Sequence, residues 1–466
     1  MSSSLRERLD HPVIDADGHT IEFMPQVAEY CREVAGAEVA RQFERSGCLD
    51  GLPLALEARA NGGPGLAIRP PWWAVPARNT LDRATAMFPR LLYDRLDEMG
   101  LDFAVLYPTH GLFALGLEED EVRQAACRAF NLYHARLYGE FADRLAPVAV
   151  IPMNTPGEAV AELEHARALG LKAVLLGGMC QRDVNGRRRL DVVGFHNAYD
   201  YDPVWAACER LGFAPAFHSS GMGWGSRASD KSYVYNHIGN FAAAQEAICR
   251  SLFLGGVTRR FPGLTFAFLE GGVGWACNLF SDLIGHWEKR NVEALRHYDP
   301  AMLDRAELER LFDRYAPKPF VDKKKELDRT LRILSNPNED PATLDEFAAL
   351  QIDRAEQIVE LFVEPFHFGC EADDPINQFA FNRRGNPFGA ELKALFSSDI
   401  GHWDVPDMSG VLAEAYELVE HGLITPANFR DFVFGNAVSL YTAVNPRFFD
   451  GTVIAPHLQE LSLIHI

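Results

Sequence analysis

The stretch VIDADGHTIE, from Val13 to Glu22, decides the fold of this chain. Its first residues, Val13 and Ile14, predict the start of a short buried strand. Asp17 and His19 stand two residues apart, and an extended backbone points such alternate side chains to the same side. A carboxylate and an imidazole aimed at one point make half of a divalent-metal site. Alone the stretch is more typical of a surface turn, so the remaining ligands must come from elsewhere.

The composition describes an acidic globular protein. The chain has 466 residues, of which 47% are hydrophobic and 24% charged, as is ordinary for a protein with a large core. Lys and Arg number 45 and Asp and Glu 65, which gives a formal net charge of −20. Such a surface repels nucleic-acid phosphates and anionic lipids. We therefore expect neither a nucleic-acid nor a membrane partner, and no stretch approaches the roughly 18 apolar residues of a membrane helix.

The cysteines and the N-terminal residues indicate a cytoplasmic protein. Eight cysteines are scattered along the chain without a CxxC pair, which is typical of reduced thiols. The first ten residues carry Arg6, Glu7, Arg8 and Asp10, and no apolar run follows them. This pattern does not match a signal peptide.

Short apolar runs alternate with helical stretches along the chain. After the first strand, the runs lie at residues 103–107, 147–151, 173–176, 214–217, 264–269, 366–371 and 392–397. Runs of four to six residues that alternate with helices predict βα units and a parallel sheet. The runs make eight strands in all, and a carboxylate follows the last one. Eight such units favour a closed (β/α)₈ barrel over an open sheet.

Two segments interrupt this pattern. A long loop is expected at about residues 23–100, including the flexible run NGGPG at 61–65, and a charged helical insertion at about 284–363. Within the insertion, apolar residues from Leu344 to Phe362 fall near helical spacing, which predicts a helix packed on one side. Because strand-like sequence resumes after each segment, we predict a single barrel domain over residues 1–466, distorted by two insertions.

Candidate metal ligands collect at the C-terminal ends of three predicted strands. Asp17 and His19 follow the first strand, His218 the fifth and Asp399 the eighth. In a closed barrel the first and eighth strands are neighbours, so Asp399 should lie beside Asp17 and His19. Two imidazoles and two carboxylates suit Zn²⁺, Mn²⁺ or Fe²⁺, which would activate a water molecule. Taken singly, His218 could instead be a core histidine and Asp399 the cap of a turn.

Several short motifs resemble one known family, the amidohydrolase superfamily, in the branch typified by aminocarboxymuconate-semialdehyde decarboxylase and the aromatic-acid decarboxylases. That branch usually opens with Ile-Asp-x-His-x-His, and this chain has IDADGH at residues 14–19, with Asp17 in place of the first histidine. His218 matches the metal histidine after strand five. The run SSDIGHWD at residues 397–404 is similar to the branch's Gly-Ser-Asp-Tyr-Pro-His, and Gly435-Asn436-Ala437 fits its last helix.

The resemblance implies further site residues, and the departures from it matter. Glu270 precedes two glycines where the branch usually has His-Gly-Gly, and it could move a proton, bind the metal or hydrogen-bond a substrate. His402 is a candidate proton donor, or a loop histidine. No lysine closes strand four, so the resemblance implies one metal ion, Zn²⁺ first, with Mn²⁺ or Fe²⁺ as alternatives. We expect the metal ligands to be Asp17, His19, His218 and Asp399, and the catalytic residues Asp399, Glu270 and His402.

The residues around these candidates suggest supporting roles. Glu22 is expected to support His19 as an outer partner. His110 and Glu371 follow the second and seventh strands and should face the barrel mouth, unless they are solvated loop residues. A decarboxylase needs a cation to orient its acid substrate, and three loop arginines are candidates: Arg69, Arg78 and Arg227.

Three functions stay open at this point. The first is a metal-dependent hydrolase that uses an activated water on a small organic substrate, carboxylated or aromatic. The second is a metal-dependent, non-oxidative decarboxylase of an aromatic or enoic acid, and the third is a non-catalytic barrel that binds a ligand. We favour the hydrolase because Glu270 replaces the histidine of the better-known decarboxylases. Family habit implies a homodimer or a larger homo-oligomer.

Overall fold

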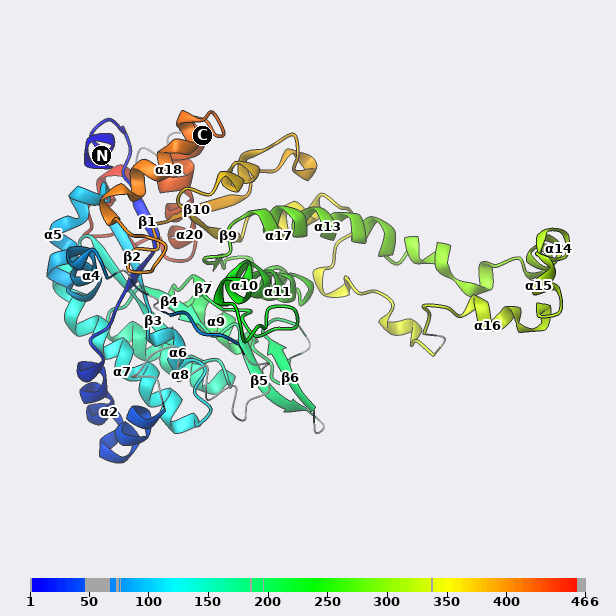
Figure 1. The fold of residues 1–466 in the computed structure, drawn as a ribbon, viewed down its shortest axis with the longest axis horizontal. Coiled ribbons are helices and arrows are strands. Elements are labelled where there is room, and N and C mark those ends of the chain that lie inside the picture. The colour runs from blue at the N-terminus through cyan, green and yellow to red at the C-terminus, as the bar shows by residue number, and fades with distance from the viewer. Residues whose placement is uncertain are drawn as a thin grey trace.

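The computed structural model describes residues 2–46, 68–72, 75, 77–184, 187–195, 197–336 and 338–458. Figure 1 shows a body built around a parallel sheet, with both termini on one side of it. A long extension, drawn in green and yellow, leaves the opposite side of the body. None of the described helices is long and apolar enough to cross a membrane.

Eight parallel strands form the centre of the body. They are β1 (Ile14–Thr20), β2 (Phe103–Pro108), β3 (Leu145–Ile151), β4 (Ala173–Leu176), β7 (Pro215–Phe217), β8 (Phe266–Phe268), β9 (Phe366–Glu371) and β10 (Lys393–Ser397). Neighbours pair in the order β1-β2-β3-β4-β7-β8-β9-β10, and each of these pairs is parallel. All eight strands predicted from the sequence are present, and where both ends were predicted the bounds differ by at most two residues.

Backbone hydrogen bonds bring the last strand back to the first. The amide of Asp399, just after β10, donates to the carbonyl of Asp17 at 3.1 Å, and the amide of His19 donates to the carbonyl of Ile400 at 3.1 Å. These bonds nearly close the sheet into a ring. The distorted (β/α)₈ barrel predicted from the sequence is therefore confirmed.

Helices follow the strands and cover the outside of the barrel. The main ones are α5 (Pro89–Met99), α7 (Asp120–Tyr138), α8 (Pro156–Ala168), α9 (Asp202–Leu211), α11 (Asn240–Leu254), α13 (Gly274–Arg290), α18 (Val411–Glu420) and α20 (Asn436–Val444). Their ends follow local sequence signals. Thr155 and Glu158 form a capping box at the start of α8. Gly100 and Gly212 adopt φ of 75° and 74° and end α5 and α9, a conformation that glycine accepts at no steric cost.

Short helical segments occupy the connections. They are α1 (Ser2–Arg6), α6 (Gly111–Ala114), α10 (Tyr233–His237), α12 (Val257–Arg260), α19 (Pro426–Arg430), η1 (Gly139–Phe141), η7 (Pro375–Phe381), η8 (Pro387–Gly389), η9 (Met408–Gly410), the π-helical η10 (Asp431–Gly435) and η11 (Ala455–His457). Several of these connections leave the C-terminal strand ends, where the candidate site residues lie.

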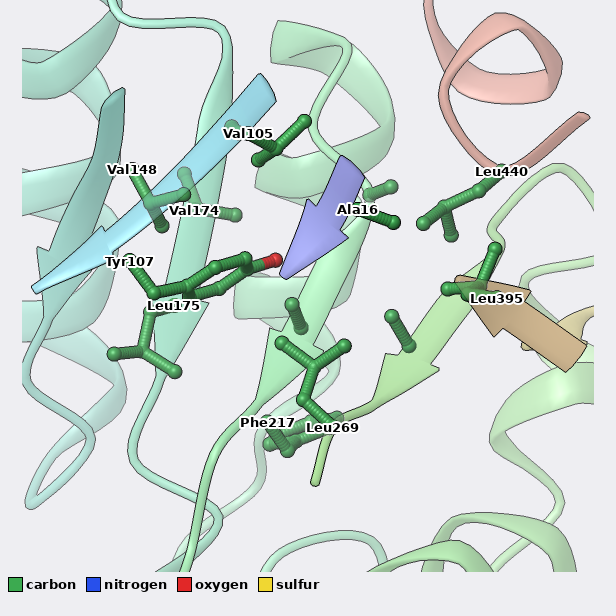
Figure 2. Packing of buried hydrophobic residues seen from close by; sticks show 14 of the residues in the cluster. Ala16, Val105, Tyr107, Val148, Val174, Leu175, Phe217, Leu269, Leu395 and Leu440 are labelled. Carbon is green, nitrogen blue, oxygen red and sulfur yellow. The ribbon is translucent and has the colours of Figure 1, made fainter. Parts of the chain in front are cut away.

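Apolar side chains fill the inside of the barrel (Figure 2). Val105, Val174, Phe217 and Leu395 point inward from four different strands and are at most 1% exposed. Burial of each such side chain contributes about 1.5–3 kcal/mol relative to leaving it in water. The interior is thus a packed core, and the candidate metal ligands lie at its C-terminal rim.

The segment expected as a long loop after the first strand contains helices. Helix α2 (Met24–Arg45) has a proline in its first turn, and α4 (Thr80–Met87) begins at Asn79, whose side chain accepts the amide of Asp82. The expectation of a loop over residues 23–100 is therefore wrong for these parts. The glycine-rich run at residues 61–65 lies outside the described residues.

A two-stranded hairpin was not foreseen. Strands β5 (Met179–Val184) and β6 (Arg187–Val192) pair antiparallel beyond β4. The guanidinium of Arg182 donates to the carboxylate of Asp191 at 2.6 Å. The dipeptide Asn185-Gly186 stands between the two strands, and Asn-Gly is a strong sequence signal for hairpins.

The second insertion begins inside α13 and ends at α17 (Gln357–Phe362). The helix predicted from Leu344 to Phe362 is wrong, because Gln351 adopts φ of 50° and separates η6 (Ala348–Leu350) from α17. The expectation that this segment packs on the body is still met, because three apolar residues of the spacing are buried: Phe347, Ile358 and Phe362.

We call residues 291–346 the arm, and it forms most of the extension in Figure 1. Its elements are η2 (Ala294–Tyr298), η3 (Pro300–Met302), α14 (Arg305–Tyr315), α15 (Lys318–Val321), η4 (Lys324–Glu326), α16 (Leu327–Leu331) and η5 (Pro341–Thr343).

Candidate metal centre

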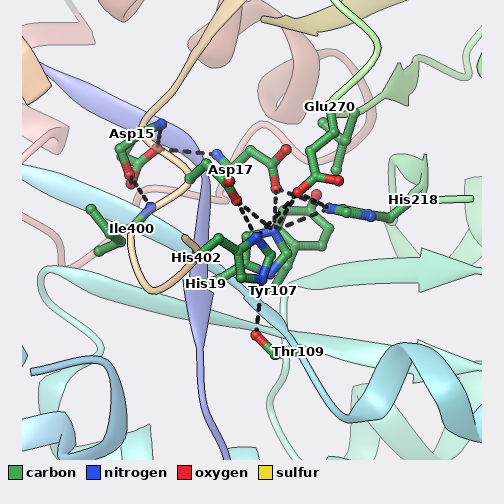
Figure 3. Close-up of polar contacts among 12 residues, drawn as sticks. Asp15, Asp17, His19, Tyr107, Thr109, His218, Glu270, Ile400 and His402 are labelled. Carbon is green, nitrogen blue, oxygen red and sulfur yellow. Dashed lines mark hydrogen bonds and ion pairs between the residues drawn. The ribbon is translucent and has the colours of Figure 1, made fainter. Parts of the chain in front are cut away.

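Six side chains from four strands meet at the C-terminal rim of the barrel (Figure 3). Asp17 and His19 belong to β1, and His218 directly follows β7. Glu270 lies two residues beyond β8, and Asp399 and His402 lie in the turn after β10. The structure therefore brings together all the residues that the sequence analysis proposed as metal ligands or catalytic groups.

His19 is at the centre of this group. Its Nε2 atom lies 3.0 Å from Nε2 of His218, 3.5 Å from Oε1 of Glu270, 3.5 Å from Oδ1 of Asp399 and 3.6 Å from Oδ1 of Asp17. Nε2 of His218 lies 3.4 Å from the same oxygen of Glu270. Two imidazoles and three carboxylates thus point their ligand atoms at one small volume.

Unpartnered buried oxygens show that this volume suits a cation. Asp17 is fully buried, yet within the described part of the chain neither of its carboxylate oxygens has a hydrogen-bond partner. Oε2 of Glu270 is buried without such a partner as well. Buried carboxylates are normally hydrogen-bonded or bound to metal, because desolvation of an unpaired charge is costly. Oxygen and imidazole ligands together fit a divalent metal ion.

The electrostatics of the group lead to the same conclusion. Burial raises the pKa of Asp17 to about 8 and the pKa of Asp399 well above its usual range, and neighbouring Glu270 adds to both shifts. For Glu270, burial also acts to raise the pKa, but the imidazoles of His218 and His402 outweigh it and hold the pKa well below its usual range. Three carboxylates this close repel one another, and a divalent cation would remove that repulsion.

Backbone strain is concentrated at two of these residues. Glu270 and Asp399 adopt φ of 54° and 50°, in the left-handed region that residues with a side chain rarely occupy. Each such conformation costs on the order of 1–3 kcal/mol and persists only where surrounding contacts enforce it. Here backbone bonds at both strand ends do so, from Leu269 to Phe217 and from Asp399 to Asp17, each 3.1 Å long.

Asp15 supports the candidate metal centre through hydrogen bonds, a role that the sequence analysis did not assign. Its buried carboxylate accepts the amide and hydroxyl of Ser398 at 2.9 and 2.5 Å and the amide of Asp17 at 3.2 Å. Gly18 makes room for it, because a Cβ atom at Gly18 would lie 2.5 Å from Oδ2 of Asp15. Asp15 thereby fixes the turn of Asp399 against the strand of Asp17. The sequence signal that could have indicated this role is the position of Asp15 in the opening Ile-Asp motif.

His402 connects the carboxylates to a neighbouring strand. Its Nδ1 atom lies 2.6 Å from Oδ1 of Asp399 and 3.4 Å from Oε1 of Glu270, and its Nε2 atom lies 3.2 Å from the hydroxyl of Thr109. Burial acts to lower its pKa, but the Glu270 carboxylate outweighs this effect and raises it. The position beside Asp399 is suited to a proton donor.

Glu22 does not support His19, contrary to the expectation. Its carboxylate accepts the backbone amide of His110 at 2.9 Å and lies 3.2 Å from Nδ1 of the same residue. His134 approaches its other oxygen at 3.8 Å. Glu22 therefore orders the loop after β2, and its influence on the metal centre is indirect.

Acidic residues surround the outer side of the centre. Glu371 and Asp404 approach Asp399 so that one ligand atom of each lies within 4.8 Å of the others. No lysine or arginine of the described residues forms an ion pair with Glu371 or Asp404. Two of the loop arginines considered from the sequence are engaged elsewhere, since Arg69 donates to Lys231 at 2.7 Å and Arg227 to Gly239 at 3.1 Å.

Arg83 is a cation that the sequence analysis missed. It lies on α4, whose Ala86 carbonyl accepts the amide of Ile21 at 2.8 Å and so docks the helix at the end of β1. One guanidinium nitrogen of Arg83 is buried and has no hydrogen-bond partner within the described ranges. Burial lowers the pKa of this guanidinium. Among the described residues, Arg83 is thus a half-buried guanidinium without an ion-pair partner, on a helix docked at the barrel end that carries the centre.

A family model described as amidohydrolase matches residues 14–320. The chain belongs to the amidohydrolase family. The matched segment contains Asp17, His19, His218 and Glu270, and the resemblance noted in the sequence is confirmed.

Solved structures of similar fold extend over nearly the whole chain. An amidohydrolase from Mycobacterium avium subsp. paratuberculosis K-10 is 18% identical, covers 93% of this chain and 100% of its own, and superposes with a TM-score of 0.53. A 5-carboxyvanillate decarboxylase from Sphingomonas paucimobilis is 14% identical, covers 92% of this chain and 98% of its own, and gives a TM-score of 0.50. At these identities the comparisons establish the barrel fold.

Proposed function

We propose that this amidohydrolase-family enzyme is a metal-dependent hydrolase of a small organic substrate. The observation that carries the proposal is the convergence of Asp17, His19, His218 and Asp399 around a volume where buried carboxylate oxygens have no described hydrogen-bond partner. These four residues would hold one divalent ion, Zn²⁺ by preference for this ligand set, with Mn²⁺ or Fe²⁺ as alternatives. When bound, such an ion lowers the pKa of a water molecule towards neutrality.

The protein's own residues would then move the proton. Asp399 lies at the rim with Oδ1 2.6 Å from Nδ1 of His402. A proton accepted from water by Asp399 can pass along this contact to His402, which can donate it to the leaving group. Glu270 lies 3.4 Å from His402 and stabilises the protonated form of that imidazole. It lies equally far from the proposed ligand His218, which would stay neutral, and helps to orient its ring. Asp15 positions Asp399 through Ser398.

The charge around the centre favours a neutral or cationic substrate. Asp404 adds a carboxylate beside Asp399, whereas burial raises the pKa of Glu371 well above its usual range, and neither residue forms a described ion pair with a lysine or arginine. An anionic substrate would be repelled at this side of the mouth. The acidic composition supports a small-molecule substrate over nucleic acid, and the free cysteines among the described residues support a cytoplasmic location.

A carboxy-lyase acting on an aromatic or enoic acid is the second candidate. Arg83 is the observation that favours it, because a half-buried guanidinium without a described partner is suited to bind a substrate carboxylate. The two candidates therefore differ in which residue recognises the substrate and in what is released.

One experiment divides the two candidates. Purified enzyme with a measured metal content is incubated in H₂¹⁸O with panels of amides, lactones and aromatic acids, and ¹⁸O incorporation and released CO₂ are followed. The hydrolase predicts ¹⁸O in the product without CO₂, and Arg83→Gln then behaves like the exposed control Arg90→Gln. Released CO₂, with a loss of at least tenfold in kcat/KM for Arg83→Gln alone, would instead establish the carboxy-lyase. Less than about 0.2 metal equivalents and no activation by Zn²⁺ or Mn²⁺ would refute both.

A further inference from the structure

The arm has helices but no core. From residue 291 to residue 346, no described side chain is buried. Its longest helix, α14, has 11 residues, and α15 and α16 have four and five. Isolated helices below about 12–15 residues are marginal in water and are normally stabilised by packing of an apolar face. The arm therefore lacks the packing surface that its helices require.

Large apolar side chains line this segment and remain in solvent. Phe320 is 54% exposed, Ile333 73% and Met302 74%. Others with at least about two fifths of their surface exposed are Val292, Tyr298, Leu303, Leu311, Tyr315, Val321, Leu331, Leu334 and Leu344. Single exposed apolar residues are common, but a concentration of them over one segment marks an interaction surface.

The arm is anchored at its base and held together by ion pairs. At the base, the ring of Phe280 on α13 stacks on that of Phe362 on α17, with centroids 5.3 Å apart. Further out, Arg305 contacts Glu309 at 2.8 Å and Asp328 at 2.5 Å, which links α14 to α16. These contacts hold a formed arm away from its own body, as Figure 1 shows.

The charge of the outer arm is opposite to that of the rest of the chain. Residues 305–331, from α14 to α16, carry eight basic and six acidic side chains, a net charge of +2. The arm as a whole, residues 291–346, carries −3, so the body outside it carries −17 of the chain's −20. Lys318, Lys323, Lys325 and Arg329 form no ion pair with any described residue. The outer arm thus offers positive charges and apolar side chains together.

We propose that the arm docks on the body of a second copy of this chain, so that two copies exchange arms. The acidic body of a second copy attracts the outer arm, whereas two arms facing each other would repel. If each copy docks its arm on the body of the other, both arms and both bodies find a partner in a closed two-fold dimer. An anionic membrane is the less suitable partner, since the body of the same molecule would be repelled from it. This inference is independent of the proposed function.

The test is the mass in solution of the full-length protein, by light scattering after size exclusion and by sedimentation velocity. A chain of 52.0 kDa should run as a dimer at micromolar concentration. Replacing Leu311 and Phe320 by aspartate should raise the dimer dissociation constant at least tenfold. Val453→Asp, at an exposed apolar position on the body, should leave it unchanged. Raising NaCl from 0.05 to 0.5 M should weaken the dimer severalfold.

Hydrogen exchange identifies the docked segment directly. Amides of α14 and α16 should be protected in the dimer and should lose protection in the Leu311→Asp, Phe320→Asp variant, while barrel amides keep theirs. A wild-type protein that stays at 52.0 kDa at 100 µM would overturn the proposal, as would a dimer that the arm variant leaves intact. Monomeric protein that floats with vesicles containing 30% phosphatidylserine would also overturn it and assign the arm to a lipid surface.

Discussion

At the mouth of the barrel, the fully buried oxygens of Asp17 have no described partner, whereas along the arm Phe320 and Ile333 lie in solvent. Buried charge without a partner and exposed apolar surface without a partner are both unfavourable for a chain alone. The comparison teaches what each region lacks. The mouth needs a cation, and the arm needs a protein surface.

The largest effect on turnover should follow from replacing the Asp399 carboxylate at the barrel rim. Asp399→Asn keeps the shape of the side chain but cannot accept the proton that His402 relays, so kcat should fall by about 10²–10⁴-fold. Turnover assays and circular dichroism check loss of activity against retention of fold. Asp94→Asn, on the exposed face of α5, is the matched control. Activity of Asp399→Asn near that of the control would remove Asp399 from the mechanism.

The next largest effect, on metal affinity, is expected at Asp15, which hydrogen-bonds the residues around the metal centre. Asp15→Asn weakens the bonds to Ser398 and to the Asp17 amide, so the turn that presents Asp399 loses its support. Residues that orient ligands typically change metal affinity by about 10–100-fold. Titration of chelator-treated protein with Zn²⁺ measures this loss. An unchanged Zn²⁺ affinity would show that Asp15 does not position the centre.

A smaller effect is expected at Glu22, which lies outside the ligand group. Burial acts to raise its pKa, but His110 outweighs this and lowers it. Its ionised form therefore stabilises the fold above the unfolded-state pKa, and this stability is lost as the pH falls through the folded-state pKa. Glu22→Gln should cost about 1–3 kcal/mol of unfolding free energy at pH 7 and flatten the acid side of the stability profile. Denaturation in urea from pH 3 to pH 7 measures both, and a profile parallel to wild type would contradict the assignment.

The smallest effect, on the stability of the barrel, is expected from a substitution in the arm. Because the arm has no core of its own, Leu311→Asp should change the unfolding free energy of the barrel by less than about 0.5 kcal/mol under conditions where the protein is monomeric. Metal content should also stay the same. A large loss of barrel stability in the monomer would mean that the arm packs on its own body.

Much of the barrel could be predicted from the sequence because its strands are short apolar runs that alternate with helical stretches. The positions of Asp17, His19, His218 and Asp399 followed from the rule that chemistry lies at C-terminal strand ends. The strain at Glu270 and Asp399 could not be predicted, since positive φ at these residues is imposed by long-range backbone bonds. Arg83 was missed because nothing in its local sequence shows that it has no hydrogen-bond or ion-pair partner among the side chains that the structure describes.

Helical periodicity was the least reliable guide. The apolar spacing from Leu344 to Phe362 predicted one helix, yet its buried members lie at the start of η6 and within α17, two short elements that residues 351–356 separate. A spacing pattern reflects which side chains are buried and does not show whether the backbone between them is one continuous helix. Helix α2 was not predicted because its sequence is mostly polar and has only a weak apolar stripe.

The central claim is that unpartnered carboxylates at the mouth are held for a metal ion. Its most direct test is the thermal unfolding of wild type and Asp17→Asn, each with EDTA and with Zn²⁺. Asparagine avoids burying an unpaired charge, so the metal-free variant should unfold about 2 °C or more above metal-free wild type. Zn²⁺ should reverse the order by stabilising wild type far more than the variant. A wild type that Zn²⁺, Mn²⁺ and Fe²⁺ do not stabilise, or a variant less stable under both conditions, would contradict the account.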